Sequence, residues 1–138
     1  MTREQILTDP GKVNLVLQLC VLTKQYLDSQ ESPEQLVEHY LTDLELDEIR
    51  YIVDEAGEVI AFADFDWIRS LEDVRKPSWE RESGEILFIL KCYVKQAKLM
   101  RKLLKLAPPH QWIVWERDGA IHAPKGLPTN VEQTEVLA

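Results

Sequence analysis

The stretch that decides the fold is residues 86–115, ILFILKCYVKQAKLMRKLLKLAPPHQWIVW, which holds six Lys and Arg and no acid. All 24 Asp and Glu lie in the other 108 of the 138 residues. The first five residues of the stretch are too apolar to face water, and they predict a buried strand over 85–94. Apolar residues at helical spacing then predict a cationic amphipathic helix over 95–107, which the two following prolines would end. A second apolar run predicts a strand over 111–116.

The charge of the chain is unevenly divided. The net charge is −8, yet residues 1–85 carry 8 Lys and Arg against 20 Asp and Glu, net −12, while residues 86–115 are net +6. Overall repulsion argues against a nucleic-acid or anionic-membrane binder. The local positive patch suits one phosphate group or an acidic protein surface. A simpler interpretation is the solvated face of an amphipathic helix, with or without ion pairs to the acidic first half.

Length and composition indicate a single domain over 1–127, followed by a loose tail over 128–138. No apolar run approaches the roughly 20 residues that span a bilayer, so no membrane partner is expected. Cys20 and Cys92 fall on apolar patterns, and they and the three scattered His show no metal-ligand spacing. We therefore expect no metal and no disulfide, and a location in a reducing cytoplasm or in a virion assembled there.

Two helices are predicted in the first third of the chain, after a short edge strand at 5–7. The first begins at Pro10 with Asp9 as its N-cap and runs to about residue 28. The second begins at Pro33, because Ser32 and Gln35 have the spacing of a capping box.

The hydrophobic period changes from helical to alternating near residue 48. Alternation over 49–53 and 59–67, with a turn between them, predicts a hairpin. A long polar loop over 68–84 then leads to the central strand. The order strand, helix, helix, hairpin, strand, helix, strand predicts an α/β (α+β) domain with a mixed sheet whose last two strands are parallel.

This order of elements resembles the GNAT superfamily of acyltransferases, and the resemblance covers roughly residues 5–127. The segments Gly57-Glu58-Val59-Ile60-Ala61-Phe62-Ala63 and Lys125-Gly126-Leu127 resemble two GNAT segments, the passage from the second to the third strand and the one after the fifth. The resemblance implies a mixed central sheet with two N-terminal helices and one long helix between the fourth and fifth strands.

The same resemblance implies a coenzyme site at the start of the cationic helix. GNAT enzymes bind pyrophosphate through Gln/Arg-x-x-Gly-x-Gly/Ala, and Gln96 occupies the first position of that motif. Leu99 and Arg101 occupy the two glycine positions, so close approach of the backbone is lost. If acetyl-CoA or acyl-CoA is bound, the residues implied are Lys95, Gln96, Lys98 and Arg101. Otherwise no cofactor is expected.

Candidate catalytic residues are few. Tyr93, near the end of the central strand, is in the place of the general acid that GNAT enzymes often use, or it is a core aromatic. Trp79, Ser83-Gly84 and the strand that follows resemble the toxin-activating lysine acyltransferases, which pair a histidine near the N-terminus with an aspartate on the central strand. This chain has Lys91 where that aspartate is expected.

Two further sets of polar residues are candidates. His39, the only histidine upstream of the central strand, is a candidate base or a half-exposed helix residue. Asp64 and Asp66 alternate along a predicted strand, where they either orient an amine substrate or are merely solvated.

Two functions follow from these patterns. The favoured one is a non-catalytic GNAT-like protein that acts by protein–protein association, because its motif loss and length resemble degenerate GNAT-like proteins of tailed phages. Its partner, another protein or a second copy of the chain, would bind the basic helix 95–107. The alternative is an acyl-CoA-dependent N-acyltransferase with a divergent coenzyme site.

Overall fold

The computed structural model of the chain describes residues 1–124 and 127. The helices are α1 (Arg3–Leu7), α2 (Pro10–Tyr26), α3 (Pro33–Leu46) and α4 (Leu99–Leu106), with two 3-10 helices at Leu71–Arg75 and Ser78–Glu80. The strands are β1 (Ile49–Val53), β2 (Val59–Ile68), β3 (Ile86–Val94), β4 (Trp112–Arg117) and β5 (Ala120–His122). Among the described residues, no helix combines the length and the apolar character that crossing a bilayer requires.

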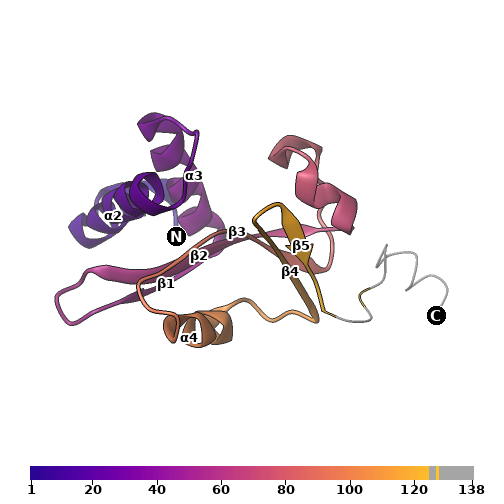
Figure 1. Cartoon of the computed structure of the whole chain (residues 1–138). Helices are drawn as coiled ribbons and strands as arrows, with labels where there is room; N and C mark the ends of the chain where they lie inside the picture. The colour runs from indigo at the N-terminus through magenta and orange to yellow at the C-terminus, as the bar shows by residue number, and fades with distance from the viewer. Residues whose placement is uncertain (125–126, 128–138) are drawn as a thin grey trace. The chain divides into compact units, whose positions relative to one another are not determined.

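The strands form one sheet in the order β1-β2-β3-β4-β5 (Figure 1). β1 and β2 are antiparallel, as are β4 and β5, whereas β3 and β4 are parallel. The parallel ladder runs from the pair Ile86 and Trp112 to the pair Ile89 and Trp115. The predicted α+β class, the hairpin and the parallel last pair of the predicted strands are therefore confirmed.

The chain divides into two compact units. Unit 1 comprises residues 1–64 and 91–107, and unit 2 comprises residues 65–90 and the part from residue 108 onward. β2 and β3 contribute residues to both units, because the boundaries at 64/65 and 90/91 fall within these strands.

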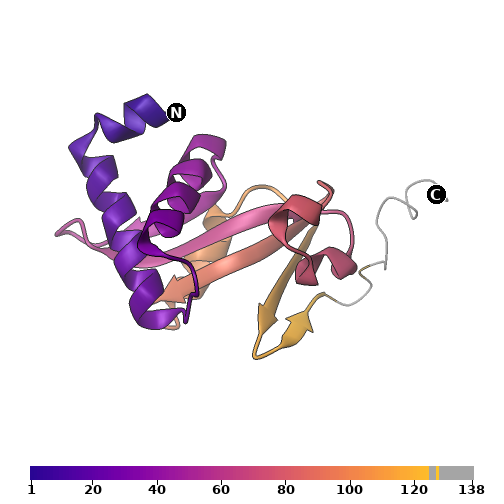
Figure 2. The ribbon, with the colours of Figure 1, turned by 90° about the horizontal axis from the view of Figure 1, so that it is seen from above.

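Unit 1 is a hairpin with helices on both faces. α2 and α3 lie on one face of β1 and β2, and α4 lies on the other (Figures 1 and 2). The core between the helices α1–α3 and the hairpin is built from Ile6, Leu15, Val16, Leu19, Leu36, Tyr40, Leu41, Ile49, Val59 and Phe62. On the opposite face, Leu99 and Leu103 are the buried residues of α4.

The predicted starts of the two long helices are confirmed. The carboxylate of Asp9 accepts hydrogen bonds from the amides of Gly11 and Lys12, so α2 begins at Pro10. Ser32 and Gln35 form the reciprocal capping box of α3. Each cap satisfies amides that the first turn of a helix leaves unpaired.

Two predictions about elements are wrong. The segment 5–7 is not an edge strand: it belongs to α1, where Thr2 and Gln5 form a second capping box and Ile6 inserts into the core. The long helix expected over 95–107 is only α4, because the amide of Lys95 still bonds the Ile60 carbonyl and residues 95–98 form turns before Leu99. An apolar pattern alone does not show where the strand ends and the helix begins.

Unit 2 has its own core of Ile68, Val74, Ile86, Phe88 and Val114. Trp112 packs against this core, whereas Trp115 is exposed and stacks on His122. The loop before β3 passes close to the end of β2. A Cβ atom on Gly84 would lie 2.4 Å from both the Arg69 Cα and the Ile68 carbonyl oxygen, so only glycine fits there without a shift.

Candidate functional site

Four cations lie on one side of α4. Lys98, Arg101, Lys102 and Lys105 are spaced i, i+3, i+4, i+7 and are all exposed. None of them, nor Lys95, forms an ion pair with any described residue, so these cations form the solvated helix face that the sequence predicts, without ion pairs to the acidic half in this part of the protein. Leu104 and Leu106 add exposed apolar area, 37% and 48% of each residue, beside the cations. We call these six residues and Lys95 the basic face.

The residues implied to bind a coenzyme A pyrophosphate lie on the turns before α4 and in its first turn. Lys95, Gln96, Lys98 and Arg101 are all exposed. The amide of Leu99 donates to the Gln96 carbonyl at 3.0 Å, and the amide of the next residue donates to a carbonyl in the same turn. These two amides are satisfied within the chain, which leaves the side-chain cations as the means of holding an anion here.

Tyr93 packs among aromatic residues of unit 1. Its ring stacks on Tyr26 with a centroid distance of 5.1 Å and contacts Phe62 at 6.2 Å. Burial, and secondarily the neighbouring Tyr26, raise the pKa of Tyr93. A raised pKa makes the hydroxyl a weaker acid than that of an ordinary tyrosine, so it adds nothing to the case for a proton donor.

A buried polar cluster joins α3 to β2 and β3. His39 Nε2 lies 2.7 Å from Asp64 Oδ2 and 3.3 Å from Asp43 Oδ2. Asp64 is fully buried, so its predicted place on a solvated strand face is wrong: its side chain points toward α3. Asp66, its companion in that prediction, lies in unit 2, with Arg81 Nη1 3.3 Å from its carboxylate.

Lys91 and Glu31 extend the cluster. The backbone amide of Lys91 donates to Asp64 Oδ1 at 2.8 Å, and its ammonium group donates to Glu31 Oε1 at 2.6 Å. The second Glu31 oxygen lies 3.6 Å from His39 Nδ1. Lys91, noted in the sequence as standing where an aspartate was expected, therefore holds Asp64 and Glu31 in place.

The carboxylates govern the protonation of His39. Burial lowers the pKa of His39, but the neighbouring carboxylates of Asp43 and Asp64 outweigh burial and raise the pKa to about 10. Burial raises the pKa of Asp43 to about 8, against the opposing effect of His39. An imidazole that is charged at neutral pH is a poor general base, so this pairing does not supply the base that the toxin-activating enzymes use.

The two cysteines are not activated. Burial raises the pKa of Cys20, and it raises the pKa of Cys92 to about 11. Both thiols are free, and the Cys92 thiol donates to the Met100 sulfur at 3.8 Å. Neither has the lowered pKa that a nucleophilic cysteine needs.

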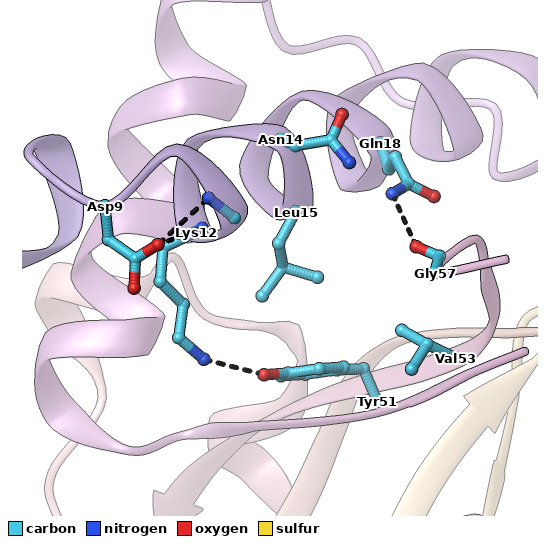
Figure 3. Close-up of a pocket in the computed structure, with 9 residues that line it drawn as sticks. Asp9, Lys12, Asn14, Leu15, Gln18, Tyr51, Val53 and Gly57 are labelled. Carbon is cyan, nitrogen blue, oxygen red and sulfur yellow. Dashed lines mark hydrogen bonds between the residues drawn. The ribbon is translucent and has the colours of Figure 1, made fainter. Parts of the chain in front are cut away.

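An open pocket lies between α2 and the hairpin of unit 1 (Figure 3). The Lys12 ammonium donates to the Tyr51 hydroxyl at 2.9 Å across its floor. At its other end the Gln18 side chain donates to the Gly57 carbonyl at 3.1 Å and accepts from the Val59 amide at 2.8 Å. These polar groups are hydrogen-bonded to one another. We therefore interpret their hydrogen bonds as a clamp that holds α2 to the hairpin, and not as a ligand site.

Replacing Gln18 by alanine is expected to lower the free energy of unfolding by about 1–3 kcal/mol, because two backbone groups of the hairpin lose their partner. Urea unfolding followed by circular dichroism measures the change. Asn14→Ala is the matched control, since Asn14 lines the same pocket from the same helix and is exposed. Equal stability of the two variants would contradict the clamp.

Sequence reasoning missed the cluster as a unit. It singled out His39, Asp64 and Lys91 separately but did not bring them together, and it passed over Asp43. One signal was available, since His39 and Asp43 are spaced i, i+4 on a predicted helix and so share a face.

Comparison with known protein families, with curated proteins and with solved structures found no match to this chain.

Proposed function

We propose that the protein acts by protein–protein association and not by acyl transfer, with the basic face of α4 as its binding surface. The observation that carries the proposal is the stripe of four exposed cations that have no ion-pair partner among the described residues. Protein interfaces combine an apolar centre with a polar, charged periphery. The exposed leucines and the unpaired cations of the basic face supply both kinds of surface. By resemblance to degenerate GNAT-like phage proteins, the proposal extends to a structural or internal component of a virion.

The occupant proposed is an acidic surface on a second copy of the chain. In unit 1, six exposed carboxylates form no ion pair with the described residues: Glu4, Asp9, Asp28, Glu34, Glu55 and Glu58. Contact between the basic face of one molecule and such carboxylates of the next would be head-to-tail, which produces rings or filaments. Complementary charge would set the orientation and the rate of assembly more than its affinity.

The alternative N-acyltransferase has weaker support. Leu99 and Arg101 stand where the motif needs glycine, and Leu99 is buried beneath the first turn of α4. His39 pairs with carboxylates through both ring nitrogens and is charged at neutral pH. Tyr93 remains the candidate general acid of that alternative.

Reversing two charges of the basic face is expected to abolish self-association. Light scattering coupled to gel filtration should give a mass that rises above 16.0 kDa with concentration at low salt. The mass should return toward the monomer in about 0.5 M NaCl, where charges are screened beyond roughly 4 Å. The variant Lys102→Glu/Lys105→Glu should remain a monomer in both buffers.

The matched control is Lys24→Glu/Arg117→Glu, which changes the net charge equally at exposed cations of two other elements, α2 and β4. It should associate as the unaltered protein does. A wild-type protein that stays monomeric at low salt, or a control that also loses association, would overturn the proposal. Saturable micromolar binding of acetyl-CoA or a long-chain acyl-CoA, weakened by Gln96→Ala or Lys98→Glu, would favour the acyltransferase instead.

A further inference from the structure

Three donor atoms converge between α3 and β2, away from the basic face. His39 Nε2, Asp43 Oδ2 and Asp64 Oδ2 all lie within 4.8 Å of one another. The side chains of Asp43 and Asp64 are 6% and 0% exposed, whereas 27% of the His39 side chain is exposed. The cluster is thus buried on its acidic side and reachable from solvent beside the ring.

Asp43 is the member that the protein itself does not satisfy. Its Oδ2 is buried and has no hydrogen-bond partner among the described residues. The 3.3 Å ion contact with His39 Nε2 is the weaker of two, since that nitrogen hydrogen-bonds Asp64 at 2.7 Å. A buried carboxylate oxygen without a donor is unfavourable, and a cation placed among the three atoms would remove the cost.

The surrounding groups hold the donors in a ligating arrangement. The Lys91 amide binds Asp64 Oδ1, which leaves Oδ2 facing His39. Glu31 lies behind the ring, 3.6 Å from Nδ1, and is itself held by the Lys91 ammonium. A metal ion would replace the proton on Nε2, and a carboxylate behind the imidazole is the usual support of a metal-bound histidine, because it keeps the remaining proton on Nδ1.

We propose that His39, Asp43 and Asp64 bind a divalent transition-metal ion of the zinc and manganese class. One imidazole and two carboxylates favour such an ion over Mg²⁺ or Ca²⁺, which take oxygen ligands. A neutral ring and two carboxylates also balance its charge. Tetrahedral ligands at about 2.1 Å from the metal lie about 3.4 Å apart, so the His39–Asp64 contact widens by several tenths of an ångström on binding. Water would complete the coordination.

Thermal shift and titration calorimetry with Zn²⁺ test the site, after a chelator has removed bound metal from the protein. We expect one equivalent to bind and Tm to rise by at least about 5 °C at a free concentration roughly 100-fold above Kd. Asp43→Asn should lower the Tm of the metal-free protein only modestly, since it loses the 3.3 Å ion contact with His39 but no hydrogen bond, and should reduce affinity by at least about tenfold. Co²⁺ gives a second readout, a visible absorption spectrum of a histidine-carboxylate site that the variant lacks.

The other two histidines supply the matched control. His110→Gln/His122→Gln changes exposed imidazoles in unit 2 and should bind Zn²⁺ with unchanged stoichiometry. The proposal is overturned if wild-type protein shows neither a shift in Tm nor calorimetric binding, if folded Asp43→Asn binds as tightly as wild type, or if the control loses the ion. Mg²⁺ producing the same shift at equal concentration would overturn the assigned metal class.

Discussion

Asp64→Ala is expected to lower the free energy of unfolding by about 3–5 kcal/mol in the presence of a chelator. The carboxylate is fully buried and accepts hydrogen bonds from His39 Nε2 and from the Lys91 amide. Alanine would leave both donors facing a small cavity, one of them on a charged ring. The loss is larger than that of a surface ion pair because water cannot replace the missing acceptor. Urea unfolding followed by circular dichroism gives the value.

Two further variants separate the ion pair from general loss of packing. Asp64→Asn keeps an oxygen for the Lys91 amide, so it should cost less than alanine. The double variant His39→Ala/Asp64→Ala should cost less than the sum of its parts, because no unpaired cation remains. A change below about 1 kcal/mol for Asp64→Ala would show that the pair does not hold α3 to the strands.

Gly84→Ala is expected to destabilise unit 2 by about 3 kcal/mol or more. The added methyl group would meet backbone on two neighbouring residues, Ile68 and Arg69, and backbone cannot rotate away as a side chain does. Either the loop before β3 or the end of β2 must move, which disturbs the core around Ile68 and Ile86. Hydrogen exchange should show the loss of protection concentrated in these segments.

Gly57 and Gly119 provide controls of a different kind. Both have a φ of +81° and open space around the position of a Cβ atom. Alanine at either should cost about 1 kcal/mol from backbone strain alone. If Gly84→Ala were no worse than these two, the close approach would not limit the residue at this position.

Local signals made much of the fold predictable. The starts of α2 and α3 follow from cap residues whose partners lie within three positions. The length of α4 depended on a distant contact, the bond from the Lys95 amide to the Ile60 carbonyl, which keeps the chain extended past the apolar run. The prediction of an edge strand at 5–7 was wrong because three residues of mixed character do not distinguish a strand from one turn of a capped helix.

The buried cluster shows the same limit. His39 and Asp64 are 25 positions apart in the sequence and meet only after α3 packs on the hairpin. Alternation along β2 suggested that Asp64 faces water, because an acid between apolar residues is usually on the solvated side. The strand is instead covered by α3 at that point, and Lys91 supplies the compensating contact. Within the cluster, only the shared helical face of His39 and Asp43 could be predicted from the sequence.

The division into two units gives the molecule a set of natural optical labels. All four tryptophans, at positions 67, 79, 112 and 115, belong to unit 2, and all four tyrosines, at 26, 40, 51 and 93, belong to unit 1. Fluorescence excited at the red edge of the tryptophan band therefore reports unit 2 alone, while tyrosine absorbance in the near ultraviolet is weighted toward unit 1. Coincident melting curves from the two signals would mean one cooperative transition, and separated curves would mean that β2 and β3 each belong to two folding units.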